Sequence, residues 1–174
     1  MLTWGRGRWL VPACLALGLL TACSPTVTLQ PGPFAPDPVC AAVIQLLPAE
    51  LAGRPQVSTT AQATVAWGAT DAITLRCGVE NPPPTTDRCV TVEAGGSAVD
   101  WINPEADSPL LPPNALAEGG AWTFITYGRT PAIEVVIPAA TGIEQPTAVL
   151  VDLAPAIQRA PASRFCVEAT TLVP

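Results

Sequence analysis

Arginine and aromatic side chains recur together along this 174-residue chain and could form a ligand site. A guanidinium group binds carboxylate or phosphate through two parallel hydrogen bonds, and an aromatic face suits a cation or a sugar ring. The competing interpretation buries the rings in a core and pairs the arginines with Asp100 or Glu134 across strands. The candidate ligand-binding residues are Arg76, Arg129, Trp101 and Tyr127.

Acidic residues offer a second kind of chemistry. Glu93, Asp100, Glu105 and Asp107 cluster in the sequence around a glycine turn and a long proline-containing segment. Two carboxyl groups suffice for glycoside hydrolysis, one as acid and the other as base or nucleophile. The alternative is that these are solvated surface residues of an acidic protein. A carboxylate-dependent hydrolase acting on envelope glycan is therefore the second hypothesis for function.

Most other enzyme classes are disfavoured by residue type. All eight basic residues are arginine, and the chain has no histidine and no lysine. A Ser-His-Asp triad, a Cys-His pair, a Ser-Lys pair and a Schiff base each need one of the missing residues. No glycine-rich phosphate loop and no GxSxG turn is present. We therefore expect a protein that is not an enzyme, has no cofactor and holds no metal.

The first 22 residues read as a bacterial signal peptide. Arg6 and Arg8 supply the positive start, and Leu10 to Leu20 form an apolar run too short to span a membrane permanently. The segment ends in Leu20-Thr21-Ala22-Cys23, which resembles the lipobox in which the cysteine is lipidated and becomes the mature N-terminus. An ordinary secretory signal with a chance cysteine is the alternative. The pattern predicts lipidation at Cys23 and a place on the extracytoplasmic face of the cell membrane.

The remaining chain is predicted to be one anchored domain. Residues 23–37 are rich in proline and are expected to form an extended tether, and residues 38–174 a single domain. Six arginines then face fourteen acidic residues, a net charge of about −8, which argues against nucleic acid as a partner. The expected partners are the membrane, through Cys23, and an unknown envelope protein or small ligand.

Four further cysteines are expected to form disulfides. An exported protein with an even number of cysteines usually pairs them, and four cysteines allow three pairings. We predict one bridge across a short proline-rich loop and another that joins the start of the domain to its end. A zinc site is the competing interpretation, although the paired CxxC spacing is absent. The predicted pairs are Cys77–Cys89 and Cys40–Cys166.

Hydrophobic periodicity predicts an α+β fold. Alternating residues indicate a mostly antiparallel sheet of about five to seven strands, in which Ile73, Leu75, Cys77 and Val79 share one face. An N-terminal and a C-terminal helix are expected to pack on one face of this disulfide-stabilised sheet. Asn103–Gly120 is expected to be a long surface loop, and it is the part of the chain where we expect either disorder or a binding lid. Predicted helices cover Val39–Leu47 and Pro146–Leu153, with a kink or a new turn at Pro155; predicted strands cover Gln56–Thr59, Ala61–Trp67, Ile73–Val79, Cys89–Glu93, Val99–Ile102, Trp122–Tyr127, Ala132–Ile137 and Arg164–Glu168.

Several motifs in this order resemble the DUF3515 family. They are the lipobox, a helix with an early cysteine, AWG, ITLRCGV, VDW, FITYGRTPAIEVVIP and VLVDLAPAI. The similarity covers about residues 38–160. The resemblance implies an actinobacterial lipoprotein or secreted protein of unknown function and brings no catalytic residue with it. We therefore expect a membrane-anchored extracytoplasmic domain that binds a partner without chemistry.

Overall fold

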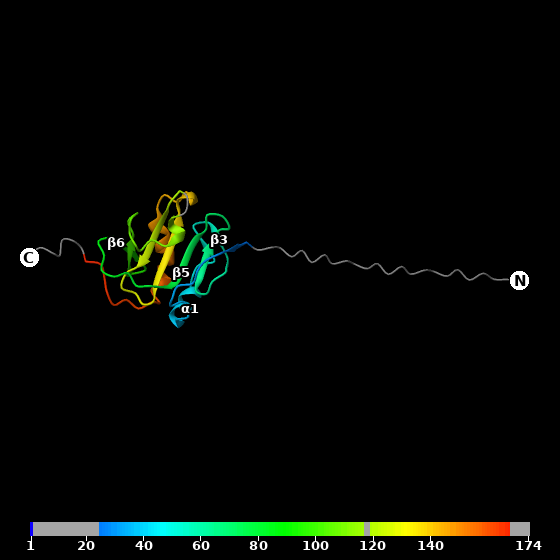
Figure 1. Ribbon diagram of the computed structural model, residues 1–174. Helices are drawn as coiled ribbons and strands as arrows, with labels where there is room; N and C mark the ends of the chain where they lie inside the picture. Colours follow the sequence, from blue (N-terminus) through cyan, green and yellow to red (C-terminus); the bar gives the residue numbers. More distant parts are fainter. Residues whose placement is uncertain (2–24, 117–118, 168–174) are drawn as a thin grey trace, which may run out of the picture.

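The domain is built on one nine-stranded, mostly antiparallel sheet with two helices on one face. The computed structural model describes residue 1 and residues 25–116 and 119–167. The strands follow the order β1-β3-β4-β5-β9-β8-β7-β6, and β2 pairs with β3 beside this path. The β3 and β6 strands therefore lie at opposite sides of the sheet (Figure 1). The elements are β1 (Thr26–Val27), α1 (Pro38–Ile44), β2 (Glu50–Leu51), β3 (Arg54–Thr59), β4 (Thr64–Trp67), β5 (Ile73–Val79), β6 (Arg88–Ala94), β7 (Ser97–Asn103), η1 (Pro113–Leu116), β8 (Ala121–Thr126), β9 (Ala132–Pro138), η2 (Ala139–Thr141) and α2 (Pro146–Ile157).

This architecture confirms the predicted fold class. The strand count is higher than expected because the two-residue strands β1 and β2 add to the seven longer ones. Alternating apolar residues form the hairpins β4–β5, β6–β7 and β8–β9, each with antiparallel register. Asp37 caps α1, since its side chain accepts a hydrogen bond from the Val39 amide. Pro155 lies inside α2, and the helix runs past it to Ile157.

One core joins both helices to the sheet. The inward faces of the central strands supply Leu75, Val135 and Phe124, all nearly inaccessible to solvent. Val43 of α1 and Leu153 of α2 pack into the same cluster. Trp67 and Trp101, the largest fully buried side chains, fill this cluster as well. Burying a side chain of this size contributes about 2–3 kcal/mol, so this face holds the domain together.

The predicted tether is incorrect for residues 25–37. Thr26 and Val27 pair in parallel with Ser58 and Thr59 of β3, and Ala35 is buried. The segment folds because its backbone finds partners along the sheet in spite of its prolines. The predicted lipidation site at Cys23 and all but the first residue of the predicted signal segment lie outside the described residues.

The β5 strand has a bulge at Gly78, so the predicted placement of Val79 on the same face as Cys77 is wrong. Cys77 pairs with Ile133 and Val79 pairs with Ala132, so two steps along β5 match one step along β9. Val79 therefore turns away from the helices, into a small second cluster with Ile125 and Ala132. Gly78 itself has a φ of 84°, a conformation that glycine adopts without strain.

Both predicted disulfide pairings are wrong. The bridges are Cys40–Cys77 and Cys89–Cys166, with Cα atoms 5.5 Å and 6.2 Å apart. Cys77 and Cys89 cannot meet because β9, β8 and β7 lie between their strands. Cys40 instead faces Cys77 in the core, where α1 covers β5, and both residues are fully buried. All four cysteines are thus bridged, which removes the zinc alternative.

The chain after α2 returns across the face that the helices leave open. We call residues 160–167 the C-terminal strap. The predicted strand at Arg164–Glu168 does not form over its described residues. An isolated bridge joins Ala162, earlier in the strap, to Arg129. The strap lies so close to Gly128 that a Cβ there would be 2.1 Å from the Arg164 carbonyl oxygen. The predicted long loop contains the short helix η1 and begins within β7.

Candidate functional site

Arg76 is not free to hold a ligand, because it forms an ion pair across the sheet. Its Nε and Nη2 atoms donate to the two carboxylate oxygens of Glu134, each at 2.7 Å. The two residues are direct partners in the β5–β9 register, and their side chains are 17% and 4% exposed. The Glu134 hydrogen bonds raise the pKa of Arg76, against the lowering effect of burial. The interpretation that pairs this arginine with Glu134 is therefore confirmed.

Arg129 is also used within the fold. Its guanidinium donates to the carbonyl oxygens of Ala160 and Ala98, and only 7% of the residue is exposed. Burial lowers the pKa of Arg129, and the negative charge of Asp100 offsets part of that effect. This arginine thus links the C-terminal strap to β7 rather than facing solvent.

The two aromatic candidates lie in different environments in the structure. Trp101 is fully buried and packs edge-on against Phe124, with ring centroids 6.5 Å apart. Tyr127 directly follows β8 on the other face, half-buried, with the Arg164 guanidinium 5.5 Å from its ring centroid. Of the four predicted ligand-binding residues, only Tyr127 lines a surface hollow described below.

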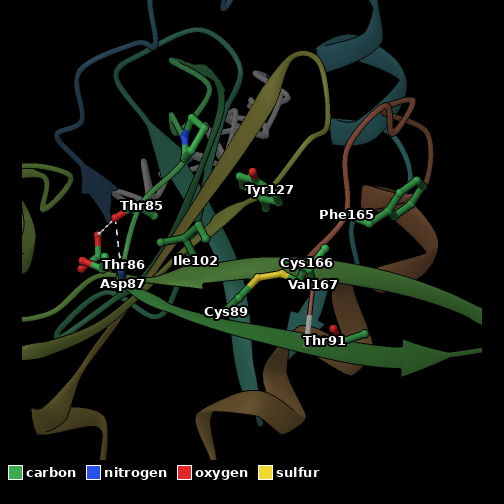
Figure 2. Close-up of a pocket in the computed structure, with 11 residues that line it drawn as sticks. Thr85, Thr86, Asp87, Cys89, Thr91, Ile102, Tyr127, Phe165, Cys166 and Val167 are labelled. Atoms are coloured by element: carbon green, nitrogen blue, oxygen red, sulfur yellow. Dashed lines mark hydrogen bonds between the residues drawn. A yellow bond between two sulfur atoms is a disulfide. The ribbon is translucent and has the colours of Figure 1, made fainter. Parts of the chain in front are cut away.

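A broad groove opens beside the second disulfide, and we call it the Cys89 groove. Its volume is about 870 Å³, large enough for a peptide segment or a small ligand. Cys89 and Thr91 of β6 point to the helix-free face, opposite Ile102 and Asp100 of β7. Figure 2 shows the bridge between β6 and the C-terminal strap, with Asp87 and Phe165 on opposite sides of it. The lining residues are Pro84, Thr85, Thr86, Asp87, Cys89, Thr91, Ile102, Tyr127, Phe165, Cys166 and Val167.

One wall of the groove is organised by the Asp87 carboxylate. It accepts hydrogen bonds from the Glu105 amide at 3.0 Å, the Ser108 hydroxyl at 2.8 Å and the Thr85 hydroxyl at 2.9 Å. Burial alone would raise the pKa of Asp87, but these hydrogen bonds stabilise its charged form and lower the pKa below its ordinary value. Asp87 therefore fixes the loop after β7 and is not poised to act as an acid.

The opposite wall is fixed by Asp100. Its Oδ1 accepts a hydrogen bond from the Thr91 hydroxyl at 2.7 Å, and its Oδ2 accepts one from the Cys166 amide at 2.8 Å. The amide of Tyr127 donates to the Asp100 carbonyl oxygen at 2.8 Å. A buried carboxylate with both oxygens bonded is a structural group here. It holds the C-terminal strap against β6 and β7, together with the Cys89–Cys166 bridge.

The candidate carboxylates do not converge on one site. Glu93 and Glu105 line different hollows of the described surface, and both carboxylate oxygens of Asp100 are bonded within the fold. Asp107 is exposed on the loop and lines none of these. Hydrolysis by a carboxylate pair requires two acidic groups across one cleft. Nor do three or more histidine, cysteine or acidic residues come together as a metal site within the described ranges.

The Cys89 groove itself was missed by sequence reasoning, although one signal pointed to it. In β6 the residues Cys89 and Thr91 alternate with the inward Val90 and Val92, so a cysteine stands on the polar face. That placement indicates a bridge outside the core. The partner could not be identified from sequence because the strap that carries Cys166 has no regular structure.

Comparison with known proteins gives a family and no activity. Residues 14–165 match a family model described as a protein of unknown function (DUF3515). Neither the curated proteins nor the solved structures contain a match. No helix among the described residues is long and apolar enough to cross a membrane.

Proposed function

Since the chain belongs to the DUF3515 family, whose description assigns no activity, we propose a function from the site itself. The protein is a lipid-anchored lipoprotein of the cell envelope whose extracytoplasmic domain binds a partner through the Cys89 groove without chemistry. The observation that carries this proposal is the groove, where exposed apolar side chains lie beside polar ones. Phe165 and Val167 are 67% and 74% exposed on the C-terminal strap. Exposed aromatic and aliphatic groups within a polar rim are typical of protein-binding surfaces.

A protein segment fits this groove better than a small polar ligand. The hydroxyl of Thr91 and the carboxylate of Asp87 already have hydrogen-bond partners within the domain. Few polar side chains therefore remain to fix the orientation of a small ligand. In addition, β6 is the last strand in the sheet order, so no strand among the described residues pairs with its outer edge, where an extended peptide could add. An envelope protein is accordingly the favoured partner.

Two features support the proposed compartment. The signal-like segment ends at Cys23 with lipobox spacing. The domain also carries two disulfides, which persist in exported proteins and are rare in the reducing cytoplasm. Two acyl chains on one residue anchor a protein stably to a membrane, whereas a single chain gives only weak, reversible binding. Nothing in the described geometry favours the glycan hydrolase over binding.

The anchor is tested by Cys23→Ser. We expect this substitution to abolish incorporation of a fatty-acid label and to release the protein from the membrane fraction, because the attachment thiol is lost. Cys14→Ser is the matched control, since Cys14 lies within the predicted signal segment and its loss should leave labelling unchanged. Continued membrane retention of Cys23→Ser would contradict the anchor.

The groove is tested by photocrosslinking in the native envelope. A benzophenone amino acid is placed at Thr86, an exposed groove residue, or at Thr147, an exposed residue near the start of α2. We expect illumination to give a discrete protein adduct from position 86 and none from position 147. Adducts of equal yield at both positions, or none at either, would argue against protein binding by the groove.

A further inference from the structure

The N-terminal segment leaves very little free chain between Cys23 and the folded sheet. Thr26 already pairs with Ser58 in the β1–β3 register. Three residue steps separate Cys23 from Thr26, and an extended chain covers at most about 10 Å in that distance. A lipid on Cys23 would therefore keep this edge of the sheet within about 10 Å of its own headgroup region.

Further contacts hold the segment after β1 to the sheet. The Leu29 amide donates to the Thr60 hydroxyl at 3.1 Å, and the Thr60 amide donates to the Val27 carbonyl oxygen at 3.1 Å. The Gln30 carbonyl oxygen accepts a hydrogen bond from Arg76 at 3.3 Å. Because the chain is bonded to the sheet from Thr26 onward, an anchor on Cys23 would restrict both the position and the orientation of the domain.

The segment is clamped once more where it crosses β5. The Phe34 amide donates to the Gly78 carbonyl oxygen at 2.8 Å. A Cβ on Gly32 would lie 2.3 Å from that same oxygen, and a Cβ on Gly78 would lie 2.3 Å from the Phe34 carbonyl carbon. Only two glycines allow the backbones to approach so closely. The N-terminal segment is thus fixed at both β3 and β5.

The residues that form this edge of the sheet carry no charge of their own. We define the β1 end as residues 25–30 and 56–64, which contain no acidic and no basic residue. All fourteen acidic residues of the chain lie elsewhere. Bacterial and other cell membranes carry anionic lipid, whose surface potential repels acidic side chains within about a Debye length. The β1 end, which also lies next to the predicted anchor, can therefore lie against headgroups without bringing an acidic side chain of its own to them.

We propose that the β1 end rests on the lipid headgroups of the leaflet that holds Cys23, and that this contact orients the whole domain. This inference rests on the proposed lipid anchor. The Cys89 groove adjoins β6, seven strand spacings across the sheet from β1, or about 34 Å at the usual spacing. Figure 1 shows β3 and β6 on opposite sides of the domain. The groove is then presented away from the membrane, toward partners in the envelope.

Energy transfer in vesicles tests this orientation. The lipidated protein is reconstituted into phosphatidylethanolamine–phosphatidylglycerol vesicles whose headgroups carry an acceptor dye. A donor is attached through a keto-bearing amino acid, which leaves the disulfides intact, at Ser58 of β3 or at the exposed Glu93 of β6. We expect clearly stronger transfer from position 58 than from position 93, because the two positions lie on opposite sides of the sheet. A flexible insert of about ten Gly/Ser residues after Ser24, spanning roughly 18 Å, should erase this difference.

The outcomes separate the orientation from the anchor. Vesicle flotation first reports whether the protein is membrane-bound, independently of the dyes. A protein that floats with the vesicles but transfers equally from both positions would overturn the orientation and leave the anchor in place. A protein that stays in the soluble fraction would overturn the anchor and the orientation together.

Discussion

Replacing Cys40 and Cys77 together by alanine is expected to lower the free energy of unfolding by about 4 kcal/mol. The bridge closes a sequence separation of 37 residues, and the chain-entropy model gives about 4 kcal/mol for a loop of that length. Both residues are fully buried between α1 and β5, so the loss also loosens the core. Thermal unfolding followed by circular dichroism should show a midpoint lower by about 10 °C.

The matched control is the double variant Cys89→Ala/Cys166→Ala. Loop length alone predicts a larger loss here, since this bridge spans a sequence separation of 77 residues. We expect a smaller loss, because the C-terminal strap can detach while the sheet and both helices remain folded. A global destabilisation larger than that of the buried pair would contradict the view that the first bridge belongs to the core and the second to the strap.

The second large effect is expected from Glu134→Leu. This change leaves the partly buried guanidinium of Arg76 without its carboxylate partner, while its hydrogen bond to the Gln30 carbonyl oxygen remains. Breaking a buried ion pair from one side costs about 3–5 kcal/mol, and the partial exposure of Arg76 places the expected loss near the lower value. Urea unfolding of purified protein measures the change.

A paired variant separates the ion pair from simple packing. Arg76→Met/Glu134→Leu should recover most of the lost stability, because two apolar side chains of similar size can replace a buried pair without a stranded charge. The exposed Arg159→Met serves as the control and should change stability by no more than about 0.5 kcal/mol. A double variant as unstable as Glu134→Leu alone would contradict this role for the pair.

Local sequence patterns predicted the elements that form the centre of the domain. Alternation identified the strands that became β4, β5, β6, β7, β8 and β9, and helical periodicity at Val39–Leu47 identified α1. These patterns are informative because one face of each strand is buried against the helices. Alternation along the strand therefore determines which side chains face the core. The same alternation correctly left Arg76 on the far face, opposite Glu134.

The long-range features could not be read from local patterns. Strand order separates Cys77 from Cys89 by three strands, and nothing near either cysteine encodes that order. The bulge at Gly78 turns Val79 to the other face, because one glycine shifts the register. Residues 25–37 looked like a tether because they are rich in proline. The residue that bonds to Leu29 in this segment is Thr60, 31 positions further along the chain, so no local pattern reveals the contact. The Cys89 groove depends on the strand order and on the irregular C-terminal strap, neither of which a local pattern encodes.

The most direct test of the anchored, disulfide-bridged envelope domain is non-reducing mass spectrometry of the protein extracted from its own membranes. We predict a mature N-terminal peptide that begins at Cys23 and carries the mass of at least two acyl chains. The same digest should contain Cys40 joined to Cys77 and Cys89 joined to Cys166. A mature protein that begins elsewhere without lipid, or that carries these cysteines as free thiols, would contradict the proposed anchoring and compartment.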